Sequence, residues 1–289
     1  MFQIIGIVLL FAMVFGSYIL AGGKMGVILY SLPYELMAIL GAAVAAFLIG
    51  NSVTTIKATL VGFGKVFAGP KWKRQDYKDL LSLLFQLTKT MKSKGVIALE
   101  SHIEKPAEST IFQKYPKVLK DHFATDFICD TLRMMTMNLE DPHQIEDAME
   151  KQLEKHHHED LAGAHALQQM ADGLPALGIV AAVLGVIKTM GSITEPPEVL
   201  GGMIGGALVG TFLGVFLAYG LVGPMATRMK EVTEEEGSFY RIIQSVLVAH
   251  LHGNAAQISV EIGRGDIPSS AQPSFIEMEE ALSAAPTEA

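Results

Sequence analysis

Four histidines near the middle of the chain come closer to a metal-binding motif than any other residues. His156, His157 and His158 are consecutive, and His165 lies further along the same polar segment. A zinc peptidase would require the spacing His-Glu-x-x-His, and His158-Glu159 is followed by no histidine at that spacing. Consecutive residues of a helix point in different directions and cannot converge on one ion. We therefore interpret these histidines as a solvated polar helix face, and we predict no metal site and no cofactor.

Other motifs that could support catalysis are also missing. Gly62-Phe-Gly-Lys65 lacks both the spacing of a P-loop and the Ser or Thr that follows its lysine. Cys129 is the single cysteine, so one chain cannot form a disulfide, and a reduced thiol is expected. An intramembrane hydrolase would need a buried nucleophile or a pair of acids, and the apolar segments contain neither. The residues thus predict no catalytic site and no enzyme.

The apolar residues gather in four long segments. Half of the 289 residues are hydrophobic and the mean hydropathy is +0.35, which is too apolar for an ordinary soluble domain. A helix needs about 20 apolar residues to cross the hydrocarbon core of a bilayer. The predicted fold class is therefore all-α, with four membrane spans. The segments that qualify are roughly Phe2 to Gly22, Leu32 to Gly50, Leu174 to Met190 and Leu200 to Gly223.

The basic residues predict which segments face the cytoplasm. Of the 22 Lys and Arg residues, 16 lie between Lys57 and Gly173 and four follow Pro224, whereas only Lys24 and Lys188 lie near the opposite ends of the spans. Loops kept in the cytoplasm carry the excess of Lys and Arg. Both termini are therefore predicted to be cytoplasmic. The predicted domains are spans 1 and 2 in residues 1–56, a cytoplasmic helical domain in 57–173, spans 3 and 4 in 174–224, and a cytoplasmic helix and tail in 225–289.

The predicted cytoplasmic segments have helical patterns. Leucines at helical spacing predict an amphipathic helix over Asp79 to Lys94, which Gly95 ends. From Ser269 onward the chain is small and acidic, and we expect it to fray. Further helices are predicted over Val96 to Lys105, Glu146 to Gln169 and Ala226 to His252.

The spans lack a carboxylate at mid-span. The sequence places Glu35 at the outer edge of the second span and Lys188 at the outer end of the third. A helix that carries protons usually has a carboxylate near the bilayer centre, because an ionisable group there is costly and persists only for a function. If ions cross this protein, another chain must supply the titrating carboxylate.

Small residues form a seam along the fourth span. Gly202, Gly206, Gly210 and Gly214 recur every four residues and leave a ridge without side chains, along which another helix can approach closely. Packing against the third span and contact with another subunit or partner are equally compatible with this pattern. Thr211 is the only mid-span hydroxyl of this helix, and such a residue either bonds a carbonyl of its preceding turn or lines a pore.

Two prolines bracket the third and fourth spans on the predicted cytoplasmic side. Pro175 and Pro224 could simply begin and end these spans. If the helices instead continue into the cytoplasm, each proline removes one backbone hydrogen bond and kinks its helix. The prolines would then form a hinge between membrane and cytoplasm.

Several segments together resemble the MotA family of flagellar stator subunits, which includes PomA and is distantly similar to ExbB and TolQ. The resemblance covers nearly the whole chain and implies a proton-conducting, torque-generating protein of the bacterial inner membrane, with no nucleic-acid partner. The matching segments are Leu174-Pro-Ala-Leu-Gly-Ile-Val-Ala-Ala-Val-Leu-Gly185, Val209-Gly-Thr-Phe-Leu-Gly214, Ala218-Tyr-Gly220 with Gly223-Pro224, Gly95 through Glu100 to Glu104, and Pro273-Ser-Phe-Ile-Glu277.

The resemblance also implies partners and roles for residues. It implies five such subunits around two MotB chains, whose transmembrane aspartate takes the protons, and a rotor partner, FliG. Pro175 and Pro224 would couple proton passage to movement of the cytoplasmic domain. Lys92 and Glu100 would contact the rotor, although an arginine is common in the family at the first of these positions. On spacing alone, these two residues are an ordinary helix end and a solvated side chain.

The resemblance further implies an ion pathway and leaves two alternatives open. Ala182 and Thr211 would line the pathway. Sodium-driven relatives have a threonine where this chain has Ala182, so the resemblance implies proton coupling. An ExbB-like or TolQ-like energiser would also lack its own mid-span carboxylate, but those proteins have three spans in a different order. A non-conducting membrane scaffold would fit the topology without explaining the matching segments.

Overall fold

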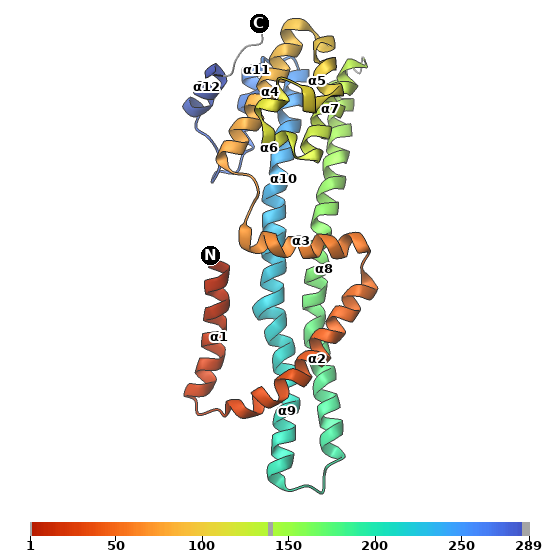
Figure 1. Ribbon diagram of the computed structural model, residues 1–289, viewed down its shortest axis with the longest axis vertical. Helices are drawn as coiled ribbons and strands as arrows, with labels where there is room; N and C mark the ends of the chain where they lie inside the picture. The colour runs from red at the N-terminus through yellow and green to blue at the C-terminus, as the bar shows by residue number, and fades with distance from the viewer. Residues whose placement is uncertain (1, 138–140, 285–289) are drawn as a thin grey trace. The chain divides into compact units, whose positions relative to one another are not determined.

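The computed structural model describes residues 2–137 and 141–284, and every regular element within them is a helix. The chain divides into two compact units, which we call the span unit and the core unit (Figure 1). The span unit comprises residues 1–69 and 160–232, and the core unit comprises residues 70–159 and 233–289. The two longest helices, α8 (Pro142–Met190) and α10 (Gly223–Leu251), contribute residues to both units.

The span unit contains the apolar helices, and all four predicted spans are confirmed. Its large hydrophobic side chains are mostly exposed, as expected of surfaces that face lipid or neighbouring subunits. Besides the C-terminal part of α8 and the beginning of α10, its elements are α1 (Phe2–Leu20), α2 (Met25–Gly50), α3 (Val53–Ala68), α9 (Pro197–Val215) and η4, a π-helix (Phe216–Val222).

The predicted start of the second span was wrong. Helix α2 begins at Met25 rather than Leu32, so the turn after α1 is short and Glu35 lies well inside the helix. Pro33 lies inside this helix. Helix α3 was not predicted at all. Ser52 caps it by accepting a hydrogen bond from the Thr55 N–H (3.2 Å).

The predicted domain boundaries are the residues at which the chain enters or leaves the membrane, and they stay predictions. The two compact units divide at other residues. Residues 53–68 and 160–173 belong to the span unit because α3 packs on the middle of α8. Thr59 donates a hydrogen bond to the carbonyl oxygen of Gly163 (3.2 Å), and a Cβ on Gly163 would lie 2.9 Å from the backbone of Ala58. The helices thus touch backbone to backbone at a glycine.

The core unit is built around helix α4 (Arg74–Lys94), with parts of α8 and α10. The predicted amphipathic pattern is confirmed, because the five leucines of α4 between residues 80 and 87 are all fully buried. Trp72 stacks on Phe239 with ring centroids 3.8 Å apart. The other elements are η1 (Val96–Leu99), α5 (Glu100–Glu104), η2 (Pro106–Glu108), η3 (Phe112–Lys114), α6 (Pro116–Leu119), α7 (His122–Thr136), α11 (Ala256–Gly265) and α12 (Phe275–Ala284).

The ends of α4 follow from local hydrogen bonds. The helix begins before the predicted Asp79 because the Asp76 carboxylate accepts a hydrogen bond from the Lys73 N–H (2.7 Å), which caps the first turn. Gly95 ends the helix as predicted, with φ of +84°, a conformation that favours glycine. Beyond it, the helix predicted over 96–105 is split into the 3₁₀ turn η1 and the short helix α5.

The C-terminal segment is more ordered than predicted. Residues from Ser269 onward were expected to fray, but α12 packs on the core unit with Met278 buried. Ser274 and Glu277 cap its start: the Ser274 N–H donates to Glu277 Oε2 (2.7 Å), and the Glu277 N–H donates to Ser274 Oγ (3.2 Å). Glu277 also pairs with Arg74 of α4. The prediction of fraying relied on the small and acidic residues of this segment and did not consider this capping box.

The interpretation of the histidine run as a solvated face was wrong for two of its members. His156 and His157 are half-buried, while His158 is exposed. The His156 ring stacks on Phe123 with centroids 3.5 Å apart and meets the Tyr240 ring edge-on. A polar helix can still contribute one ring to an aromatic cluster of the core. The spacing of the histidines along α8 does not reveal such a contact, because the partner rings come from other helices.

Cys129 lies in the interior of the core unit, and burial raises the pKa of its thiol to about 12. Because the thiolate is the reactive species, we expect the native protein to react with N-ethylmaleimide far more slowly than after denaturation. Mass spectrometry of the folded and the denatured chain at neutral pH measures this difference. Complete labelling of the folded chain within minutes would contradict the prediction.

Candidate functional site

Helices α8 and α9 approach each other through small residues. A Cβ on Gly214 would lie 2.7 Å from the carbonyl oxygen of Leu174 and 2.8 Å from the Cα of Gly178. A second contact further along the pair joins Gly185 to Ala207, where an added Cβ on Gly185 would come within 2.7 Å of the Ala207 methyl group. The backbones therefore touch, which only glycine permits at these positions.

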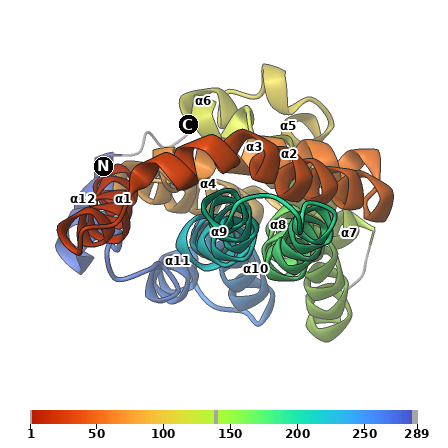
Figure 2. The same cartoon turned by 90° about the horizontal axis from the view of Figure 1, so that it is seen from below.

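Helix α2 crosses the same glycine ridge from another side (Figure 2). An added Cβ on Gly206 would lie 2.7 Å from Ser31 Oγ, and one on Gly210 would lie 2.5 Å from Glu35 Oε2. Gly210 also contacts Ala181 of α8. Three of the four predicted seam glycines are thus covered within one chain, whereas a Cβ on Gly202 would meet nothing within 4 Å.

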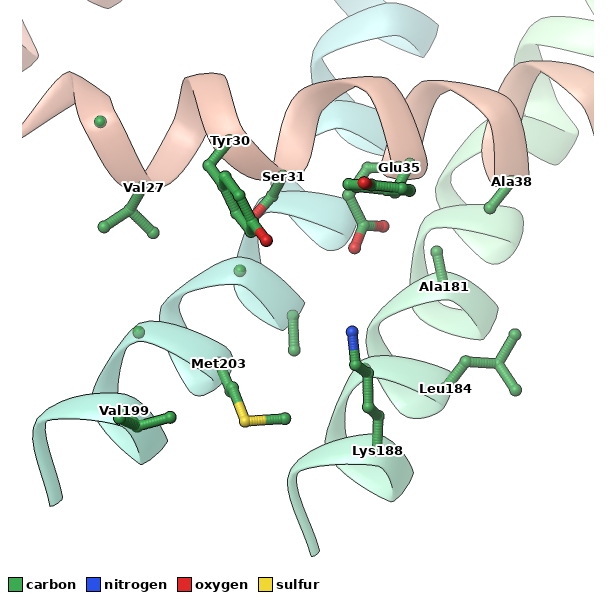
Figure 3. A pocket seen from close by; sticks show the side chains of 16 residues that line it. Val27, Tyr30, Ser31, Glu35, Ala38, Ala181, Leu184, Lys188, Val199 and Met203 are labelled. Carbon is green, nitrogen blue, oxygen red and sulfur yellow. The ribbon is translucent and has the colours of Figure 1, made fainter. Parts of the chain in front are cut away.

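A cavity of about 800 Å³ opens between α2, α8 and α9 (Figure 3). Glu35 projects into it from α2, and Lys188 projects into it from the last turn of α8. Apolar and small side chains, such as Met203 and Ala181, form the rest of the lining. The Glu35 carboxylate lies against Gly210, in the second half of α9, while its place at the outer edge of the membrane span stays a prediction.

The two predicted pathway residues lie near this contact, at a similar level of the antiparallel helices α8 and α9. Ala182 and Thr211 are both half-buried, and each follows a member of the Ala181 and Gly210 contact. Within the described part of the chain the Thr211 hydroxyl has no hydrogen-bond partner, whereas Thr189 of α8 donates to its preceding turn (2.9 Å). The Thr211 hydroxyl is therefore available to another ligand.

Both predicted hinge prolines lie within long helical paths. Pro175 is inside α8, which runs unbroken from Pro142 to Met190, so it is not a first-turn residue. Pro224 follows π-helix η4, where the Gly223 N–H bonds the carbonyl of Ala218, five residues earlier. A π-turn re-routes the hydrogen bonds that a proline cannot make. These helices therefore continue past both prolines, as the hinge interpretation requires.

The two predicted rotor-contact residues lie on the surface of the core unit. Lys92 is in the last turn of α4, and Glu100 begins α5 after the Gly95 turn. Both are exposed, and neither forms an ion pair with another described residue. Ile97, between them in sequence, is 81% exposed. Two unpaired opposite charges beside an exposed apolar residue suit a contact with another protein.

Sequence reasoning missed the place of Glu35 over Gly210. The one available signal was the continuity of apolar residues before Leu32, which allows α2 to begin earlier. Register between α2 and α9 is a tertiary property, and no pattern along either segment fixes it.

Four apolar spans that pack through small residues define an integral membrane protein. Comparison with known proteins makes this specific. Residues 4–95 match the family "Motility protein A N-terminal", and residues 119–241 match the "MotA/TolQ/ExbB proton channel family". The chain belongs to the motility protein A family.

Three relatives align over 97% of the chain. It is 40% identical to motility protein A of Escherichia coli and 39% identical to that of Salmonella typhimurium, covering 94% of each. It is 35% identical to the chemotaxis protein LafT of Vibrio parahaemolyticus, covering 98%.

Two solved structures share the fold. They are the C. jejuni MotAB structure (TM-score 0.72, 20% identity, 94% of this chain and 98% of that one) and the Bacillus subtilis flagellar MotAB stator complex (TM-score 0.67, 23% identity, 89% and 92%). The resemblance found in the sequence is confirmed.

Proposed function

We propose that this chain is the proton-conducting stator subunit of a bacterial flagellar motor and that it converts proton flow into torque together with a MotB partner. Its membership of the motility protein A family is the observation that carries this proposal. The positions of the acidic residues around the third and fourth spans agree with this proposal. Between Leu174 and Gly223 the only acidic residues are Glu195, in the turn after α8, and Glu198, in the first turn of α9. The carboxylate that takes the protons near the bilayer centre would come from MotB, as the resemblance to the MotA family implies.

Expression in a strain that lacks both stator genes tests the proposal. With its own MotB, the chain should restore swimming and co-purify with MotB from the inner membrane. Without MotB, neither swimming nor proton flux into the cells should appear. Stable membrane insertion with no swimming in the presence of MotB would contradict the stator function and favour a scaffold. Rescue of an ExbB or TolQ deletion in its place would favour the energiser.

The arrangement of subunits and the topology are part of the same proposal. Five copies would surround a MotB dimer in the inner membrane, with both termini in the cytoplasm. The exposed apolar side chains of α1, α2, α8 and α9 supply surfaces for both lipid and neighbouring subunits. The distribution of Lys and Arg supports the orientation.

Pro175 and Pro224 would couple proton passage to movement of the core unit. Each lacks the N–H that would complete the helical hydrogen bonds, so bending at either position costs less than elsewhere in α8 or α10. The core unit would then push on FliG of the rotor through Lys92 and Glu100.

We expect the driving ion to be the proton. Ala182 offers a methyl group where sodium-driven relatives have a threonine, so this position adds no oxygen that could coordinate a partly dehydrated cation. Swimming speed should fall when an uncoupler removes the proton gradient, and should not change when external sodium is replaced by potassium. Speed that follows external sodium while the proton gradient is absent would contradict proton coupling.

A further inference from the structure

Three metal-ligating residues that are distant in sequence meet in the core unit. His143 and Glu146 lie in the first turns of α8, and His252 follows the last residue of α10. Each offers one ligand atom, and these atoms all lie within 4.8 Å of one another. The two imidazole rings meet edge to face with centroids 5.5 Å apart, and His143 Nδ1 lies 3.8 Å from Glu146 Oε2.

The ligand types point to a divalent transition metal, best zinc. Two imidazoles and one carboxylate form a three-ligand zinc set that leaves a fourth position for water. Ligand atoms around a tetrahedral zinc are about 3.4 Å apart, since each lies about 2.1 Å from the ion. All three side chains are at least partly exposed, so small changes of rotamer can close the remaining gap.

The backbone that carries each histidine is fixed by local hydrogen bonds. Asp141 Oδ1 accepts from the His143 N–H (3.0 Å), which caps the start of α8. Past the end of α10, Gly253 has φ of +89° and its N–H donates to the carbonyl of His250 (3.0 Å). Asn254 Nδ2 donates to the carbonyl of Ala249 (2.8 Å). The main chain therefore needs no reordering to present the ligands.

The two helices are also held against each other near the site. Gln244 Nε2 of α10 donates to Glu150 Oε2 of α8 (2.9 Å). Ile145, Met149 and Leu247 are buried in one hydrophobic core, so the start of α8 and the end of α10 share that core. The separation of the ligands is thus set by packing within the core unit, which lowers the entropy lost when an ion binds.

We propose that His143, Glu146 and His252 bind one zinc ion, which joins the start of α8 to the end of α10 in the core unit. The proposal does not depend on the stator function, because it concerns binding and stability. No metal site was predicted from the sequence, because His143 and His252 are far apart along the chain and form no short motif. The ion would resist local opening at this end of the core unit.

Zinc titration of the full-length chain in complex with its MotB, purified without a histidine tag, tests the site. A colorimetric zinc chelator as competitor should report one high-affinity zinc per chain. His143→Ala and His252→Ala should each weaken binding by about tenfold or more. The matched control, His158→Ala, removes an exposed histidine of α8 outside the cluster and should leave the affinity unchanged.

Two further measurements separate loss of a ligand from loss of structure. Zinc should raise the thermal unfolding midpoint of the native chain and the His158→Ala variant, but not that of His252→Ala, whose midpoint without metal should match the native value. Cobalt should give the visible absorption of a tetrahedral site, and Glu146→Gln should change that spectrum. Equal zinc affinity in native chain, His143→Ala and His252→Ala, or no zinc bound at micromolar concentration, would overturn the proposal.

Discussion

The Gly214→Ala variant is expected to lose swimming and most of its assembled protein, although it adds only a methyl group. At this position a Cβ would lie 2.7 Å from the carbonyl oxygen of Leu174 and 2.8 Å from the Cα of Gly178. Both neighbours are backbone atoms, so no side chain can rotate away, and α8 and α9 must separate. Overpacking of this kind costs about 1–3 kcal/mol, and no hydrophobic force in lipid restores the contact.

A matched substitution on the same helix should have the opposite effect and increase the stability of the protein. A Cβ on Gly202 would meet no atom within 4 Å, so Gly202→Ala removes backbone freedom without a clash. Replacing a helical glycine by alanine gains roughly 0.5–1 kcal/mol when nothing opposes it. The thermal unfolding midpoint of the purified complex, the amount of protein in the membrane and the swimming speed measure both effects. Equal stability of Gly214→Ala and Gly202→Ala would show that the close contact of α8 and α9 is unimportant.

The spans and the leucine-rich face of α4 could be predicted because each depends on a pattern within one segment. About twenty consecutive apolar residues favour a membrane-spanning helix, and leucines at helical spacing favour an amphipathic helix. The structure contains both. The Gly95 turn could be predicted for the same reason, since its backbone conformation favours glycine locally.

The remaining features depend on residues that are far apart in sequence. Whether Gly210 faces a partner, α8 or α2 is decided by the register of three helices, and the structure places Glu35 against it. His156 belongs to an aromatic cluster only because α7 and α10 bring Phe123 and Tyr240 to it. The fold class therefore followed from the sequence, whereas the inner surface of the candidate site required the tertiary structure.

Reversing both charges of the proposed rotor contact is expected to reduce torque severely without affecting the channel. Lys92 and Glu100 are exposed and unpaired within the described chain, so Lys92→Glu with Glu100→Lys breaks no ion pair. Stability, MotB binding and proton flux should stay near native values, because an exposed charge contributes less than about 1 kcal/mol to folding. Torque should fall because like charges would face each other each time a subunit meets the rotor.

The matched control reverses another exposed pair in the same unit. Lys105 and Glu108 lie 3.3 Å apart and are 68% and 73% exposed, so Lys105→Glu with Glu108→Lys makes the same change in charge and keeps the pair. Torque measured on tethered cells should be normal in this control and strongly reduced in the Lys92→Glu, Glu100→Lys variant, and complementary reversals on FliG should restore part of it. Because salt screens exposed charges, the difference should be largest at low ionic strength. If the Lys92→Glu, Glu100→Lys variant gives normal torque under that condition, these residues are only a helix end and a solvated side chain, and the rotor is engaged through another part of the core unit.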